Sequence, residues 1–61
     1  MQTQDEWTLE RIQAQLGSDH VAWVKRQENP VALCESRATG YWYANSLDDF
    51  RAYKALARLL S

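Results

Sequence analysis

The stretch "GYWYANSLDDF", residues 40–50, places three aromatic rings directly before a helix start. If the rings end a β-strand, neighbouring side chains point to opposite faces, so Tyr41 and Tyr43 share one face and Trp42 takes the other. Ser46 is a favourable N-cap, and the acids of "SLDD" suit the positive end of a helix dipole. The stretch therefore predicts a strand over about 41–44 and a helix over about 47–60.

Upstream of these rings, the chain carries signals for one more helix and two more strands. "TQDE" fits a capping box that begins at Thr3, and Gly17 is a natural stop, which predicts a helix over about 4–16. "HVAWVKRQ" and "PVALCES" are short, rich in β-formers and alternating, with turn residues in "ENP" between them. They predict strands over about 20–27 and 31–36.

The predicted fold is an α+β domain that covers residues 1–61, with the order α-β-β-β-α. A three-stranded antiparallel sheet would carry the two helices packed on it. One alternative is a two-stranded hairpin in which "YWYA" is extended coil. In another, the helices lie on opposite faces, and the aromatic residues of both faces are then core.

A two-residue turn at Glu28-Asn29, and a second turn at "RATG" that brings Ser36 opposite Tyr41, would fix which side chains share a face of this sheet. We expect the core face to carry Ala22, Val24, Val31, Leu33, Trp42 and Ala44, beneath helices whose apolar stripe includes Phe50 and Leu56. The other face would carry Val21, Trp23, Lys25, Ala32, Cys34, Ser36, Tyr41 and Tyr43. Three large rings around the small residues Ala32 and Cys34 predict a shallow binding groove.

Size and composition narrow the function classes. A 61-residue chain buries little surface, and its single cysteine allows no internal disulfide, so a partner chain is the expected support. A net charge of −1 provides no large field to attract nucleic acid or an anionic membrane. The acidic start "MQTQDEWTLE" is unlike a signal peptide, and we expect a complete cytoplasmic protein with no membrane span.

No residue pattern predicts catalysis or a cofactor. Asp48 and Asp49 are neighbours on a predicted helix, where successive side chains diverge by about 100° and do not share a site. His20 is expected at the surface, and Cys34 as a small hydrophobe. One Cys and one His are too few for a zinc site. We therefore expect neither an enzyme nor a metalloprotein.

The predicted element order resembles that of the double-stranded RNA-binding domain, over order and length only. That family implies a basic cluster at the start of the second helix, where this chain has "SLDDF" with two acids. The departure removes the phosphate clamp. Nucleic-acid binding through the aromatic and basic sheet stays as the alternative function.

The function that the sequence favours is protein binding. We expect a small inhibitor or adaptor of the kind that phages and plasmids encode, such as an anti-CRISPR protein or a host-enzyme inhibitor, which blocks a larger protein sterically. The same face can instead close a homodimer. The expected partner-binding residues are Trp23, Lys25, Arg37, Tyr41 and Tyr43.

Overall fold

The computed structural model describes residues 7–61 and is helical throughout its regular structure, with no strand among these residues. Its four helices are α1 (Leu9–Leu16), α2 (Ser18–Lys25), α3 (Pro30–Tyr43) and α4 (Leu47–Leu60). The predicted α+β class, with its three-stranded antiparallel sheet, is therefore wrong.

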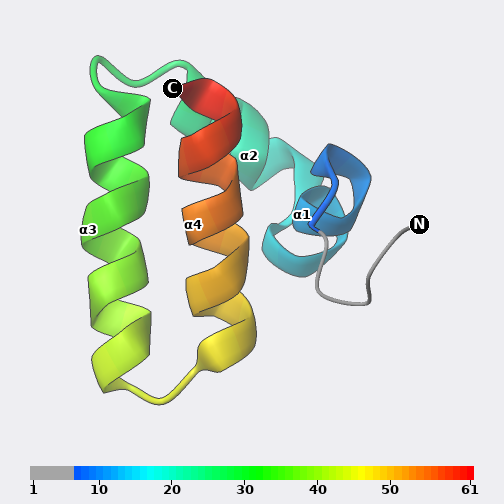
Figure 1. The fold of residues 1–61 in the computed structure, drawn as a ribbon. Helices are drawn as coiled ribbons and strands as arrows, with labels where there is room; N and C mark the ends of the chain where they lie inside the picture. The colour runs from blue at the N-terminus through cyan, green and yellow to red at the C-terminus, as the bar shows by residue number, and fades with distance from the viewer. Residues whose placement is uncertain (1–6) are drawn as a thin grey trace.

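The helices form an antiparallel hairpin with a smaller helical pair beside it. α3 and α4 run side by side in opposite directions, and α1 and α2 lie on one side of them (Figure 1). α1 packs on α4, and α2 contacts the neighbouring helices α1 and α3. This arrangement leaves the opposite side of the α3–α4 hairpin uncovered by other helices.

The "ENP" stretch is a helix start and not a strand turn. The side chain of Asn29 accepts a hydrogen bond from the backbone N–H of Ala32 at 3.1 Å, and Pro30 takes the first helical position. Proline is favoured there because its missing N–H has no helical partner in any case. The same two residues that predicted a turn therefore begin α3, and the strands over 31–36 and 41–44 are replaced by one helix.

Burial along α2 and α3 follows a helical period. Val21 and Val24 are buried on α2, and Cys34 and Ala38 on α3, so spacings of three and four replace the alternation of a strand. The predicted core face is therefore wrong as a set. Val24 is buried, but Trp42 is 56% exposed. Ala22 and Ala44 of that face are also exposed, whereas Val21 and Cys34 of the opposite face are core.

The predicted first helix begins later than expected. α1 starts after Thr8, whose Oγ1 accepts a hydrogen bond from the Arg11 backbone N–H at 3.2 Å. The predicted cap at Thr3 lies outside the described residues. The end is as predicted, because Gly17 has a φ of 95° and its N–H donates to the Gln13 carbonyl at 2.8 Å. α2 then begins at once.

α4 spans Leu47–Leu60, the range that the apolar stripe predicts. Ser46 occupies the predicted N-cap position, but its side chain makes no capping hydrogen bond. The tight turn before it uses Asn45 at a φ of 62°, a left-handed conformation that asparagine tolerates. This turn closes the α3–α4 hairpin.

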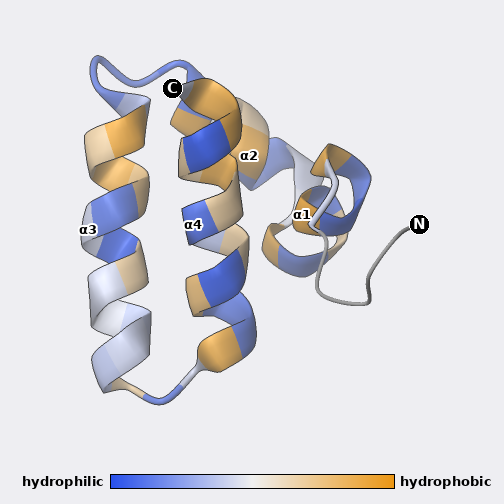
Figure 2. Ribbon diagram, in the orientation of Figure 1, coloured by the Kyte–Doolittle hydropathy of each residue, from blue (hydrophilic) through white to orange (hydrophobic). Residues whose placement is uncertain are grey.

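The core is small and is centred on α4. Tyr53, Leu56 and Ala57 of α4 pack with Ile12 of α1 and with the buried residues of α2 and α3. The most hydrophobic parts of α3 and α4 lie at the end of the hairpin where α3 begins and α4 ends (Figure 2). Phe50 is only half-buried, so its predicted place in the core is wrong, whereas that of Leu56 is confirmed.

Candidate binding surface

The three rings of "YWY" point in different directions because α3 continues through them. Successive helical residues turn by about 100°, so the triplet spreads around the helix. Tyr41 faces inward and stacks on Tyr53, with ring centroids 5.5 Å apart. Trp42 is 56% exposed and Tyr43 is 83% exposed. The predicted arrangement, with Trp42 inside and Tyr41 outside, is thus reversed for these two rings.

The exposed rings surround a shallow hollow that we call the aromatic corner, at the end of the hairpin away from α2. The rings of Trp42 and Phe50 lie 5.1 Å apart, centroid to centroid, and are tilted by 51°. The hollow has a volume of about 270 Å³. Its lining consists of Thr39, Trp42, Tyr43 and Phe50.

A larger depression runs along α4, and we call it the basic groove. It has a volume of about 600 Å³ and combines cationic and apolar side chains. Among residues 7–61, no carboxylate lines it. The lining consists of Trp7, Phe50, Arg51, Lys54, Ala55, Arg58 and Leu59.

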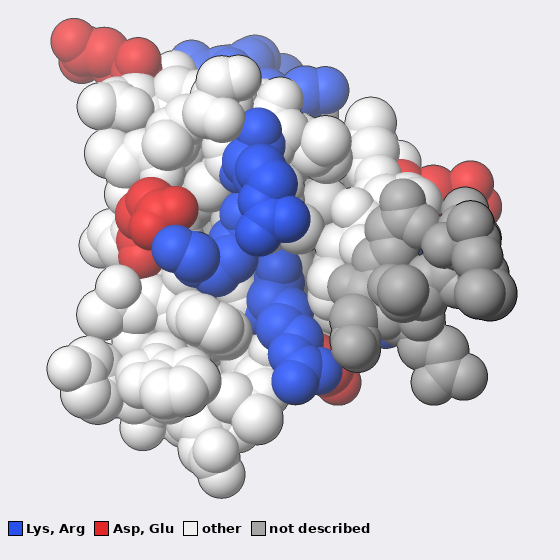
Figure 3. Space-filling model, in the orientation of Figure 1, with Lys and Arg blue, Asp and Glu red and all other residues white. Residues whose placement is uncertain are grey.

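The cations of the basic groove form a row. Arg51, Lys54 and Arg58 recur at helical spacings of three and four, and the Lys and Arg side chains of α4 form a continuous band on the face shown in Figure 3. Lys54 Nζ donates to Glu35 Oε2 of α3 at 2.8 Å. Within residues 7–61, that carboxylate is the only acidic side chain in an ion pair with the row.

Trp7, which precedes α1, also lines the basic groove. The guanidinium of Arg11 lies 4.2 Å from its ring centroid, in a cation–π contact. The indole Nε1 is buried and donates to no acceptor within the described residues. One face of this ring is therefore already occupied by a cation.

Phe50 joins the two surfaces. It lines both the aromatic corner and the basic groove, so an occupant of one can continue into the other. Leu59, which is 55% exposed, adds an aliphatic contact at the far end of the basic groove. The combined surface has aromatic rings at one end and alternating cations and apolar groups along its length.

A second group of rings connects α2, α3 and α4, from the exposed Trp23 to the buried Tyr53. The His20 ring stacks against Trp23 at 5.7 Å and meets the Tyr53 ring edge-on at 6.0 Å. Since Tyr53 also stacks on Tyr41, four rings from α2, α3 and α4 form one continuous series. A polar hollow of about 340 Å³ beside it includes Arg37.

The structure divides the five predicted partner-binding residues among different places. Trp23 and Lys25 are exposed on α2, and Arg37 and Tyr41 line the polar hollow. Tyr43 alone joins the aromatic corner. The sheet face that was expected to unite them does not exist.

The sequence interpretation missed the residues that do come together, because the aromatic member on α3 joins the residues of α4 only when α3 is a helix. They are Trp42, Phe50, Arg51, Lys54 and Arg58. The row of cations was visible in the sequence as a period along the predicted helix 47–60.

Other kinds of site find no support in the described part of the chain. Residues 7–61 contain no cluster of three or more His, Cys, Asp or Glu side chains that is able to hold a metal ion. None of the helices in this range combines the length and the apolar character that a membrane span requires.

Comparison with known proteins finds no family model, no curated protein and no solved structure that matches this chain. The surfaces described above are therefore the basis for any functional assignment.

Proposed function

We propose that the protein is a small protein-binding module, an inhibitor or adaptor that covers part of a larger protein through the aromatic corner. The observation that carries this proposal is the exposure of Trp42 and Tyr43, side by side in sequence, around a hollow that Phe50 completes. Such rings supply large contact area with few rotatable bonds, and they are enriched at binding hot spots.

The exposure is costly unless a partner covers it. Folding into this hairpin leaves Trp42 and Tyr43 in water, although a chain of this size has little apolar surface to spare for exposure. Clustered exposed apolar side chains are typical of interaction sites. A steric mechanism suits the geometry, because the corner projects from the end of the hairpin that α1 and α2 leave free (Figure 1).

Site-specific crosslinking in the source cells tests this proposal. A photoreactive phenylalanine analogue at Tyr43 should form a crosslink to one larger protein, whereas the same analogue at the exposed Ala22 of α2 should not. The double variant Trp42→Ala/Tyr43→Ala should keep its fold and lose the partner in a pull-down. A pull-down that retains the same partner with this variant would contradict the proposal.

Single-stranded nucleic-acid binding is the second candidate, and the row Arg51, Lys54 and Arg58 beside exposed rings favours it. Stacked bases and neutralised phosphates would then provide the affinity. Its test is binding of a labelled oligonucleotide over a range of salt concentrations. Such binding should weaken steeply as salt rises.

The proposal includes a cytoplasmic location and leaves room for a homodimer. Cys34 is buried and free, which suits a reducing compartment. A second copy of the chain is able to cover the aromatic corner in the absence of another partner. Light scattering across a dilution series distinguishes a homodimer from a monomer that binds another protein, since a single-chain mass at high concentration excludes the homodimer.

A further inference from the structure

We propose that the basic groove binds an acidic amphipathic segment of the partner protein, about three helical turns long. This inference rests on the proposed protein-binding function and specifies the partner's chemistry. It begins from the charge of the groove: within residues 7–61 three cations and no carboxylate line it, on a protein whose net charge is −1. The described lining of the groove is therefore more positive than the protein as a whole.

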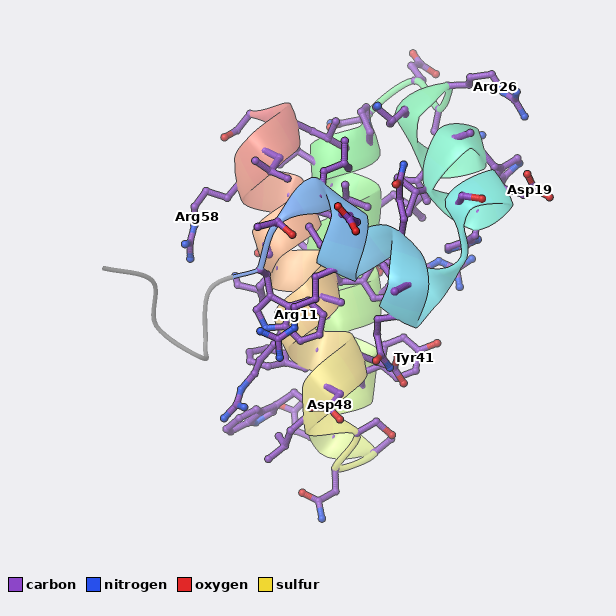
Figure 4. The ribbon with its side chains drawn as sticks, turned by 90° about the vertical axis from the view of Figure 1, so that its right-hand side faces the viewer. Arg11, Asp19, Arg26, Tyr41, Asp48 and Arg58 are labelled. Atoms are coloured by element: carbon purple, nitrogen blue, oxygen red, sulfur yellow. The ribbon has the colours of Figure 1, made fainter. Side chains whose placement is uncertain are left out.

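The cations point outward and are available to a partner. Arg58 extends away from the molecule on the face that Figure 3 displays, whereas Asp48, in the first turn of the same helix, lies on a different side (Figure 4). Arg51 and Arg58 have no ion pair within residues 7–61, and Lys54 shares an exposed one with Glu35. Exposed pairs of that kind are weak, so a partner carboxylate can replace Glu35.

The apolar lining sets the length and the character of the occupant. Phe50 and Leu59 stand nine positions apart on α4, which is about 14 Å along a helix axis. Ala55 lies between them in the sequence, and its small side chain leaves space for an occupant in the middle of the groove. An amphipathic helix laid along this path meets apolar side chains with its apolar face and the three cations with acidic residues at its edges.

The same lining argues for a peptide and against stacked bases. Base stacking needs open ring faces, but within the groove Arg11 covers one face of Trp7, and Phe50 packs against Trp42 of the aromatic corner. The remaining floor is aliphatic. A segment rich in Leu or Ile together with Asp or Glu complements it better than a nucleic-acid strand.

The experiment is a display selection of random 12-residue peptides on the immobilised protein, followed by binding measurements with the enriched peptides. They should carry acidic residues interspersed with apolar ones. Arg51→Glu/Arg58→Glu should weaken their binding by at least about tenfold. Lys25→Glu/Arg26→Glu is the matched control, because it changes net charge equally at exposed positions of α2 and its C-cap, outside the groove. This control should bind as wild type does.

Thermal melts show whether each variant folds, and Arg58→Gln replaces the double variant if that one does not. Peptides without acidic enrichment, peptides that bind the groove variant as tightly as wild type, or no enrichment at all would each overturn the inference. So would binding of a 20-nucleotide oligo(dT) probe that is lost in the groove variant, which would assign the groove to nucleic acid.

The outcomes also separate this inference from the proposed function. If the enriched peptides depend on Trp42 and Tyr43 but not on Arg51 and Arg58, the aromatic corner stands and the groove inference fails. Conversely, the crosslink from position 43 tests the proposed function without reference to the groove.

Discussion

His20 Nε2 and the Tyr53 hydroxyl lie 2.6 Å apart and share a hydrogen bond between α2 and α4. The hydroxyl donates when Nε2 carries no proton and accepts when it does. Tyr53 is 2% exposed, so His20 satisfies a polar group that would otherwise be buried without a partner. The bond adds a polar contact to the apolar packing of Val21 and Val24, which also holds α2 against the hairpin.

Tyr53→Phe should destabilise the fold by about 0.5–1.5 kcal/mol at neutral pH, the usual net value of one hydrogen bond. The ring stays, so its stacking on Tyr41 is preserved and no cavity forms. Urea unfolding followed by circular dichroism measures the change. A loss above about 3 kcal/mol would show that the hydroxyl supports more than this bond.

The same variant should alter the response to alkaline pH. Burial, with a smaller effect of Tyr41, raises the pKa of the Tyr53 phenol. The folded protein therefore keeps this proton where the unfolded chain has released it, so stability falls as pH rises above about 10. Tyr53→Phe should lose stability less steeply over this range. Parallel stability curves for the two proteins would contradict the assignment.

The two apolar residues Leu56 and Phe50 of α4 should differ on truncation, because one is enclosed and the other is not. Leu56 is 0% exposed, and Leu56→Ala should destabilise the fold by about 2–5 kcal/mol. That is a large share of the stability of a small domain. Phe50→Ala should cause a smaller loss, since Phe50 is only partly buried, at the edge of the core. Thermal melts of the two variants measure the losses of stability. An equal loss for both would place Phe50 in the core.

The lengths of the two apolar patterns explain why the sequence predicted helix 47–60 but not α3. The stripe of α4 runs over fourteen residues, long enough for its period to be unambiguous. By contrast, "PVALCES" is a seven-residue run in which buried and exposed positions fit either period. The prediction treated it apart from "YWY" because Gly40 in "RATG" signals a turn.

Gly40 is in fact an interior residue of α3. A Cβ at this position would meet nothing within 4 Å, so the glycine is required neither for close packing nor for a positive φ. Over the whole of α3, Val31, Cys34, Ala38 and Tyr41 follow spacings of three and four. The helix was thus encoded in the sequence, but only across the glycine that interrupts it.

The candidate surface was predictable in kind and not in position. Exposed Tyr and Trp side chains were expected, and the aromatic corner contains both. The prediction of which rings are exposed depended on a strand register. Because the segment is a helix, its rings do not alternate between two faces as predicted. The basic groove requires Trp7 and α4 to lie side by side, a tertiary contact that no local pattern in the sequence encodes.

Cys34 should resist thiol reagents until the protein unfolds. It is 0% exposed, and burial, followed by the charge of Glu35, raises the pKa of its thiol. The thiolate is the reactive form, so both effects slow labelling. Labelling with an aromatic disulfide reagent in native buffer should be slow and should become fast in urea. Immediate labelling of the native protein would indicate that α3 opens readily from the core.

Glu35→Gln should separate the stability of the fold from the binding of the basic groove. Lys54 and Glu35 are both well exposed, with side-chain exposures of 42% and 48%, so the lost ion pair should change stability by about 1 kcal/mol or less. Glu35 competes with a peptide carboxylate for Lys54, and the substitution removes this competition. Acidic peptides that bind the basic groove should therefore bind more tightly to Glu35→Gln, with the largest gain at low salt.

The matched control is Glu28→Gln, which changes the net charge equally at an exposed residue between α2 and α3. Titration of a labelled acidic peptide against both variants gives the comparison. An equal gain for the two would mean that overall charge attracts the peptide and that Lys54 makes no direct contact with it. A gain confined to Glu35→Gln would place a peptide carboxylate at the position that Glu35 now occupies, beside Lys54 Nζ.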